Sequence, residues 1–383
     1  MTTTESACRN CNPWPHRLAR ALACGTFPLI WMGGLVTSFR AGMSVPDWPT
    51  TYGHWFYPVQ EWFAAYRDLF LEHSHRVLAQ CVGLTAIALS VLLWRGDGRK
   101  GMRWLAVGVL GGVLFQGTLG GLRVLLDADK PAPWEWLATW IEWLRQFVDG
   151  TLLAKIHGCT APLYFALCTV AVVLTSRRWR DAESVGAAVP PPPTHQASPG
   201  RKPGDNANSQ CEPSRDLRPG LALTVTLLLY CDIVLGVQLR HYVADADPFW
   251  FQLWVWLKLI VAGAVLVGVV WLLVGQVANL PGRRQVGNLP HDTGRAFLVR
   301  RAKLLLGLFL LQAALGAATW VTNYGWPAWF TEYVWGLQYT VVAKGKLQAQ
   351  LTTLHVAFGS LTTAAALNWT LWSHCLLRGP RSR

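Results

Sequence analysis

The stretch FLEHSHRVLAQCVGLTAIALSVLLW, residues 70–94, joins a polar cluster directly to a long apolar run. The run from Val77 to Trp94 contains no acidic or basic residue and approaches the roughly 20 residues that cross a bilayer as a helix. Four polar side chains crowd its start: Glu72, His73, His75 and Arg76. Because such residues are costly at membrane depth, the cluster predicts either a function or a specific pairing.

The composition extends this interpretation to the whole chain. Of the 383 residues, 52% are hydrophobic and only 14% are charged, whereas soluble proteins carry roughly a quarter charged residues. We therefore expect an all-α polytopic membrane protein with eight transmembrane helices. The expected spans are residues 19–38, 75–94, 103–126, 152–175, 219–240, 253–276, 302–322 and 349–373.

The basic residues indicate a topology rather than a nucleic-acid partner. The net charge is +13, but most Lys and Arg fall in alternate connecting segments, such as those after residues 94 and 276. This bias is the positive-inside asymmetry and predicts that both termini are cytoplasmic. Membrane lipid is the expected partner of these charges, and we expect no binding of nucleic acid.

Internal similarity divides the chain into two halves. Gln116 and Gly120 recur at the same spacing as Gln312 and Gly316, and His157 recurs as His355. Such a repeat predicts two duplicated four-helix bundles. The expected organisation is an N-terminal cytoplasmic segment (1–18), a first bundle (19–176), a disordered Pro-rich linker (177–218), a second bundle (219–377) and a cytoplasmic tail (378–383).

Two smaller motifs lie outside the predicted spans. Residues 131–147 place aromatic side chains at helical spacing, which favours a helix lying in the lipid headgroup region. Cys8 and Cys11 form a single Cys-x-x-Cys pair. Without a second pair nearby, we interpret it as an incidental reduced pair.

Three histidines are candidate ligands because each lies within an apolar helix: His75, His157 and His355. Histidines on facing helices of a four-helix bundle are a common way to hold haem or a metal ion. Glu72 stands one helical turn before His75 and Arg76 and shares their face. His73 points about 100° away from His75 on the same helix, so we expect it to take no part.

These motifs resemble those of the haem A synthase family. The segment GGLVTSFRAGMSVPDWPTTYG (33–53) is similar to the family's stretch after its first helix, and EHSHR (72–76) resembles its Glu-x-x-His-Arg motif. The histidines at 157 and 355 fall on the fourth and eighth expected helices, as in that family. The resemblance to the eight-helix plan covers essentially the whole chain.

The resemblance implies an oxidoreductase that converts a methyl group of haem O to the formyl group of haem A by successive hydroxylations. It implies that His75 and His157 lie at the iron of the substrate haem, and that Glu72 takes part in the chemistry. Arg76 would balance charge or pair with a haem carboxylate. A haem b would bind in the second bundle through His355. The implied setting is the bacterial plasma membrane, with haem O synthase and terminal-oxidase assembly factors as partners.

The second half lacks the other expected histidine, since no His occurs in residues 253–276. Three explanations stay open: His241 replaces it, Lys258 replaces it, or His355 binds a five-coordinate haem or none. The gap also keeps an alternative function open. The chain would then be a haem-binding electron-transfer or haem-handling membrane protein that has lost synthase activity.

Overall fold

The computed structural model describes residues 12–55, 57–127, 135–188, 218–241, 247–278, 291–326 and 345–377. Apart from one isolated β-bridge between Thr51 and His54, the regular structure of these residues is helical. The long helices are α1 (Trp14–Ser38), α3 (Arg67–Gly96), α4 (Lys100–Asp127), α6 (Gly150–Thr175), α8 (Arg218–Arg240), α9 (Pro248–Ala278), α10 (His291–Tyr324) and α12 (Lys346–Leu377). The short ones are η1 (Ala41–Met43), α2 (Val59–Ala64), α5 (Glu135–Arg145) and α7 (Arg177–Ala188).

Seven of the described helices are long and apolar enough to cross a membrane: α1, α3, α4, α6, α8, α9 and α10. The expectation of an all-α polytopic protein is confirmed to this extent. The eighth expected span, residues 349–373, lies within α12, which is not one of the seven. Eight crossings and their duplication therefore stay predictions.

The lower hydropathy of α12 has a structural reason. The helix packs against α1, α6, α8 and α10, so other helices cover it on several sides. Its buried hydroxyls donate to carbonyls one turn earlier, as Thr353 does to Ala349 at 2.9 Å and Thr370 to Ala366 at 2.9 Å. Because these bonds need no water, the helix can carry polar residues in an apolar setting.

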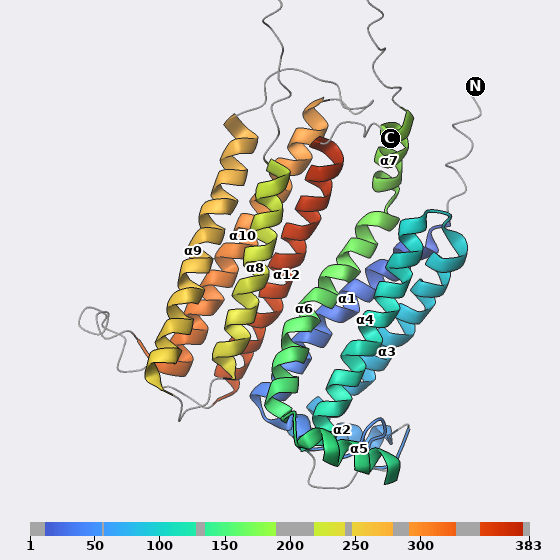
Figure 1. Ribbon diagram of the computed structural model, residues 1–383, viewed down its shortest axis with the longest axis vertical. Helices are drawn as coiled ribbons and strands as arrows, with labels where there is room; N and C mark the ends of the chain where they lie inside the picture. Colours follow the sequence, from blue (N-terminus) through green and yellow to red (C-terminus); the bar gives the residue numbers. More distant parts are fainter. Residues whose placement is uncertain are drawn as a thin grey trace, which may run out of the picture.

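The long helices pack in two groups of four (Figure 1). Helices α1, α3, α4 and α6 enclose one apolar core, which includes the fully buried Leu22 and Leu89. Helices α8, α9, α10 and α12 enclose another, which includes Val265 and Trp369. The groups meet where α12 packs on α1 and α6, and where α6 packs on α8.

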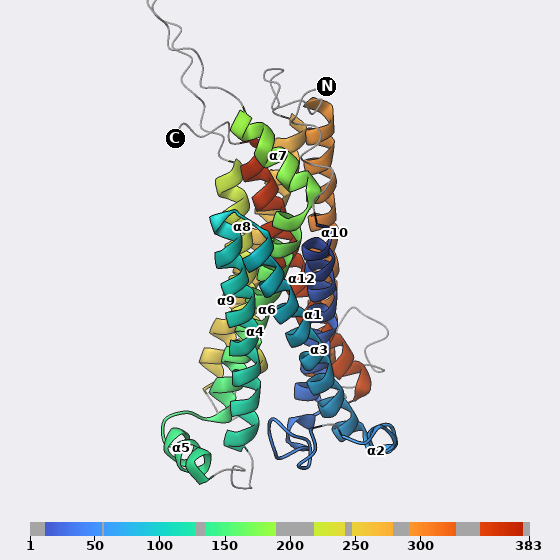
Figure 2. The same ribbon diagram turned by 90° about the vertical axis from the view of Figure 1, so that its right-hand side faces the viewer.

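The two ends of the molecule differ. Helices α2 and α5 lie at one end and α7 at the other (Figures 1 and 2). Helix α5 buries Ile141 and exposes Trp136, Trp140 and Trp143. This exposed aromatic stripe agrees with a helix lying in the headgroup region.

The start of the expected disordered linker is helical. Residues 177–188 form α7, and Trp179 packs edge-on against Trp372 of α12 with ring centroids 5.2 Å apart. The contact buries apolar surface of Trp179 and so supports the helix. The Pro-rich composition of the segment as a whole did not predict it. Residues 189–217, the Cys8 and Cys11 pair and the tail 378–383 lie outside the described residues.

One side chain fixes the first loop (residues 39–55) to the first helix group. The Trp48 ring packs into an apolar cluster with Leu119, Ile141 and Leu153, which joins α4, α5 and α6. A Cβ atom on Gly121 of α4 would lie 2.3 Å from Cε2 of this ring. Because the ring lies directly on the helix backbone, position 121 requires glycine.

We expect Gly121→Ala to lower stability by about 1–3 kcal/mol, because the added methyl must push the rigid indole out of its cluster. Thermal unfolding of the purified protein measures this effect. Gly117→Ala is the matched control on the same helix, since nothing lies within 4 Å of a Cβ there. Equal melting temperatures for both variants would contradict the close packing of Trp48 on Gly121.

Candidate functional site

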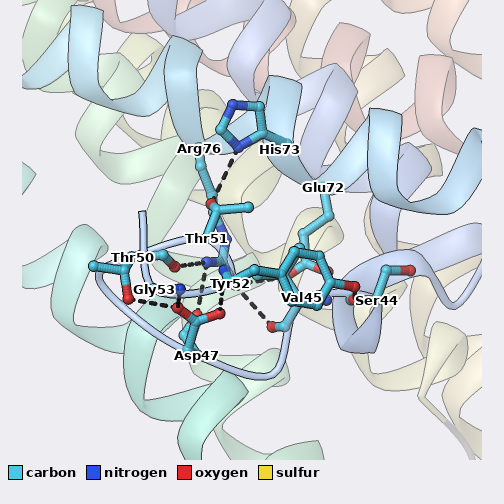
Figure 3. Close-up of polar contacts among 10 residues, drawn as sticks. All are labelled: Ser44, Val45, Asp47, Thr50, Thr51, Tyr52, Gly53, Glu72, His73 and Arg76. Carbon is cyan, nitrogen blue, oxygen red and sulfur yellow. Dashed lines mark hydrogen bonds and ion pairs between the residues drawn. The ribbon is translucent and has the colours of Figure 1, made fainter. Parts of the chain in front are cut away.

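The first loop is folded around the carboxylate of Asp47 (Figure 3). This carboxylate accepts the backbone N–H groups of Tyr52 at 2.8 Å and Gly53 at 2.9 Å, together with the Thr50 hydroxyl. Partial burial acts to raise the pKa of Asp47, but the bonds from Gly53, Thr50 and Tyr52 outweigh it and hold the pKa below its ordinary value. Gly53 has a φ of 79°, a conformation that favours glycine.

Arg76 of α3 ties this loop to the helix. Its Nη1 donates to the carbonyls of Asp47 and Thr50, each at 2.7 Å. Its Nη2 donates to the Val45 carbonyl at 3.1 Å and to Oε1 of Glu72 at 2.7 Å. Since four of the five N–H donors of a guanidinium are used in this way, Arg76 acts as an anchor for the loop.

Glu72 completes the anchor from the same helix. Only 3% exposed, it pairs with Arg76 through Oε1 and accepts the Val45 backbone N–H at Oε2, 2.9 Å away. Glu72 and Arg76 thus form an ion pair one helical turn apart, as their shared helix face allows. Within the described residues, the hydrogen bonds of Glu72 go to Arg76 and the first loop, and none goes to His75.

His73 faces away from His75, as its helical position indicates, but it takes part in the anchor. Its Nδ1 lies 3.1 Å from the Thr51 hydroxyl. Its ring packs against Tyr57 and edge-on against Trp62, with centroids 5.3 and 5.1 Å apart. The expectation that His73 takes no part was therefore wrong. It rested on the helical position of His73, and the sequence does not show which loop residues lie beside that helix.

His75 and His157 point into the first helix group from α3 and α6. A Cβ on Gly33 would lie 2.9 Å from Cε1 of His75, and one on Gly120 would lie 3.7 Å from Cε1 of His157. Each ring has a buried Nδ1 with no hydrogen-bond partner. The two imidazoles are close enough to interact electrostatically.

His355 occupies a related position in the second helix group. Its Nδ1 lies 3.1 Å from the Gln312 carbonyl, so this nitrogen carries the proton and Nε2 keeps its lone pair. A Cβ on Gly316 would lie 2.9 Å from its Cε1. A histidine held by a carbonyl in this way is orientated as metal ligands often are.

An ion pair that the sequence analysis missed lies beside His355. Lys258 of α9 donates to Oδ2 of Asp232 of α8 at 2.8 Å and to the Asp232 carbonyl at 2.9 Å. Lys258 and Asp232 both act electrostatically on His355. An Asp inside an apolar helix was the available signal for this pair.

His241 has different surroundings. It follows the last residue of α8, and its electrostatic neighbours are Arg240, Arg123 and Lys155. Burial and these cations lower the pKa of His241 to about 4. Arg123 of α4 also acts on both His75 and His157. No role for Arg123 or Arg240 was expected from the sequence.

The residues of the first group fit a haem. Two histidines on separate helices carry buried ring nitrogens without a hydrogen-bond partner. A glycine, which has no side chain, lies beside each ring on the neighbouring helix. Within the described residues, no three His, Cys, Asp or Glu side chains gather as a metal-binding group. A porphyrin supplies four of the iron ligands itself, so two histidines suffice for haem.

We expect Arg76→Lys to free the first loop, since one ammonium group cannot reach three carbonyls and a carboxylate together. Protease cleavage within residues 39–55 should become at least about tenfold faster, as loss of a buried, charge-assisted network costs roughly 1.5–3 kcal/mol per bond. Arg95→Lys is the control, because Arg95 is exposed in the last turn of the same helix, at the end away from the first loop. Unchanged cleavage of Arg76→Lys would show that other contacts hold the loop.

Comparison with known proteins agrees with the motifs of the first half. No curated protein matches the chain. Residues 16–140 match the family model COX15-CtaA, described as cytochrome oxidase assembly protein. The match contains the first loop, the Glu72–Arg76 pair and His75. Over residues 16–140, the chain is therefore similar to the COX15-CtaA family of cytochrome oxidase assembly proteins, in the part that holds the motifs resembling haem A synthases.

Proposed function

We propose that the chain is a haem A synthase-like oxidoreductase that converts a methyl group of haem O to the formyl group of haem A by successive hydroxylations. The observation that carries this proposal is the pair His75 and His157, which point into one helix group with unpartnered ring nitrogens. The family match over residues 16–140 supports it. When bound, the haem supplies the redox chemistry of its iron.

In this proposal, His75 and His157 hold the substrate haem from opposite helices. Gly33 lets the His75 ring lie directly against α1, and Gly120 faces the His157 ring from α4. The first loop, anchored by Arg76, closes this end of the helix group and limits access of water. Excluding water protects a reactive site from side reactions.

Glu72 is the proposed proton acceptor of the reaction. Its Oε2 accepts one N–H bond from Val45, and a carboxylate oxygen keeps a second lone pair at which a proton can bind. Arg76 fixes the other oxygen, Oε1, so the carboxylate has a defined orientation. Positioned carboxylates of this kind contribute roughly 100- to 10,000-fold to reaction rates.

The second helix group is proposed to bind haem b through Nε2 of His355, which the Gln312 carbonyl leaves available. Its other axial ligand stays open. Lys258 lies near His355 but is paired with Asp232, so it would have to lose a proton before binding iron. His241 lies among the cations near the first group.

The Lys258–Asp232 pair also favours the alternative function. The pair joins α8 to α9, and α9 is the helix on which the duplication would place a second histidine. A protein that binds haem for electron transfer or handling, without synthase activity, would retain His75 and His157 and produce no haem A.

The proposed setting is the plasma membrane of a bacterium, with both termini in the cytoplasm. Seven apolar helices and the exposed tryptophans of α5 support a multi-pass membrane protein. Proposed partners are haem O and haem A, membrane lipid, haem O synthase and factors that assemble terminal oxidases.

We expect Glu72→Gln to keep the bond from Val45 but to lower haem A formation at least about 100-fold, because an amide cannot take up the proton. The full-length chain is expressed in cells that make haem O, and extracted haems are identified by chromatography. Glu61→Gln, in the short helix α2, is the control. Normal product from Glu72→Gln would make Glu72 structural, and absence of haem A and its hydroxylated precursor from the unmodified chain would leave the alternative function.

The second site has a separate test. We expect His355→Ala to lose one haem per chain in a pyridine haemochrome assay, since it removes the proposed ligand of haem b. His54→Ala, in the first loop, should retain the haem content of the unmodified chain. An unchanged content in His355→Ala would mean that the second group holds no haem.

A further inference from the structure

Three basic side chains gather where the two helix groups meet, close to the histidine pair. We call Arg123, Arg240 and His241 the junction residues; the two arginines carry the positive charge, since the pKa of His241 is lowered to about 4. Arg123 belongs to the first group, whereas Arg240 and His241 stand at the end of α8 in the second. The proposed function assigns a role to none of the three.

Arg240 reaches across from the second group into the first. Its Nη2 donates to the Gly34 carbonyl at 2.9 Å and to the Ser38 hydroxyl at 2.7 Å, both on α1. The residue before Gly34 is Gly33, whose surface lies against the His75 ring. Arg240 is therefore held on the stretch of α1 that borders His75.

Arg123 approaches the same place from α4. It stands one helical turn after Gly120, which faces the His157 ring, so both lie on one face of the helix. Its Nη1 would lie 3.6 Å from a Cβ on Gly42 of η1. Its charge acts electrostatically on His75, His157, Arg240 and His241.

The two arginines lack a neutralising partner. Within the described residues, Arg123 forms no hydrogen bond or ion pair, and Arg240 bonds only to a carbonyl and a hydroxyl. The other group acting on His241 is the cation Lys155. Uncompensated charges next to apolar helices are costly, so such a cluster predicts an anionic ligand.

Arg76 cannot readily fill this role. Four of its N–H donors are committed to Glu72 and the first loop, and redirecting them would break the anchor. A haem carries two carboxylate groups at one edge, and guanidinium groups bind carboxylates well because their paired N–H donors match the two oxygens.

We propose that Arg123 and Arg240 bind the carboxylate groups of the haem held by His75 and His157. This inference rests on the proposed function. Arg240 belongs to the second helix group, whereas His75 and His157 belong to the first. The second group would therefore contribute to haem binding in the first group. The second group would be needed for that site even without a haem of its own.

The test compares two probes that differ only in the carboxylates: haem b and its dimethyl ester. Each is titrated into the purified, haem-depleted full-length chain, and binding is followed by absorbance. We expect Arg123→Gln and Arg240→Gln each to weaken binding of haem b about tenfold or more. Both variants should bind the ester within about twofold of the unmodified chain, since the ester offers no anionic partner.

Arg20→Gln is the matched control, because it removes one charge from α1 at the opposite end of the same helix group. Arg123→Gln is the decisive variant, since Arg123 forms no hydrogen bond to any other residue that the structure describes. Equal weakening for haem b and its ester, or weakening for neither, would overturn the inference and leave the proposed function intact. A chain that binds neither probe would overturn both.

Discussion

The ion pair between Glu72 and Arg76 is the interaction on which the rest of the site depends. Both side chains come from the first turns of α3, and both form hydrogen bonds to the first loop. A buried carboxylate and a buried guanidinium each need several partners. Here three loop carbonyls and one loop N–H provide them. The same cluster that is costly in a membrane helix therefore fixes a loop over the end of the bundle.

This arrangement separates two tasks within five consecutive residues. Glu72, His73 and Arg76 bind the loop or each other, while the buried Nδ1 of His75 has no hydrogen-bond partner within the described residues. The Trp48 ring closes the loop against α4 at Gly121, so the loop is fixed on α3 and α4 together. A rigid cover of this kind would position the side chains proposed as haem ligands and would exclude water from them. Both effects would favour the proposed oxidation of a haem substituent.

The sequence predicted the helical membrane architecture and the shared helix face of Glu72 and Arg76, because these follow from hydrophobic length and helical spacing. The roles of His75, His157 and His355 as haem ligands stay predictions. It did not predict the loop contacts of His73 or the helix at residues 177–188, since both depend on side chains distant in the chain, such as Thr51 and Trp372. Charged residues inside apolar helices were a signal that was available but not used. Asp232 forms an ion pair across two helices, and Arg123 lies beside the histidine pair.

We propose that His75 and His157 together hold one haem in the first helix group. Electron paramagnetic resonance of the ferric, haem-loaded full-length chain tests it most directly, because the spin state reports the axial ligands of the iron. We expect the spectrum to contain a low-spin component that is lost in both His75→Ala and His157→Ala and is retained in His355→Ala. A low-spin signal that survives in both first-half variants, or that only His355→Ala removes, would contradict it.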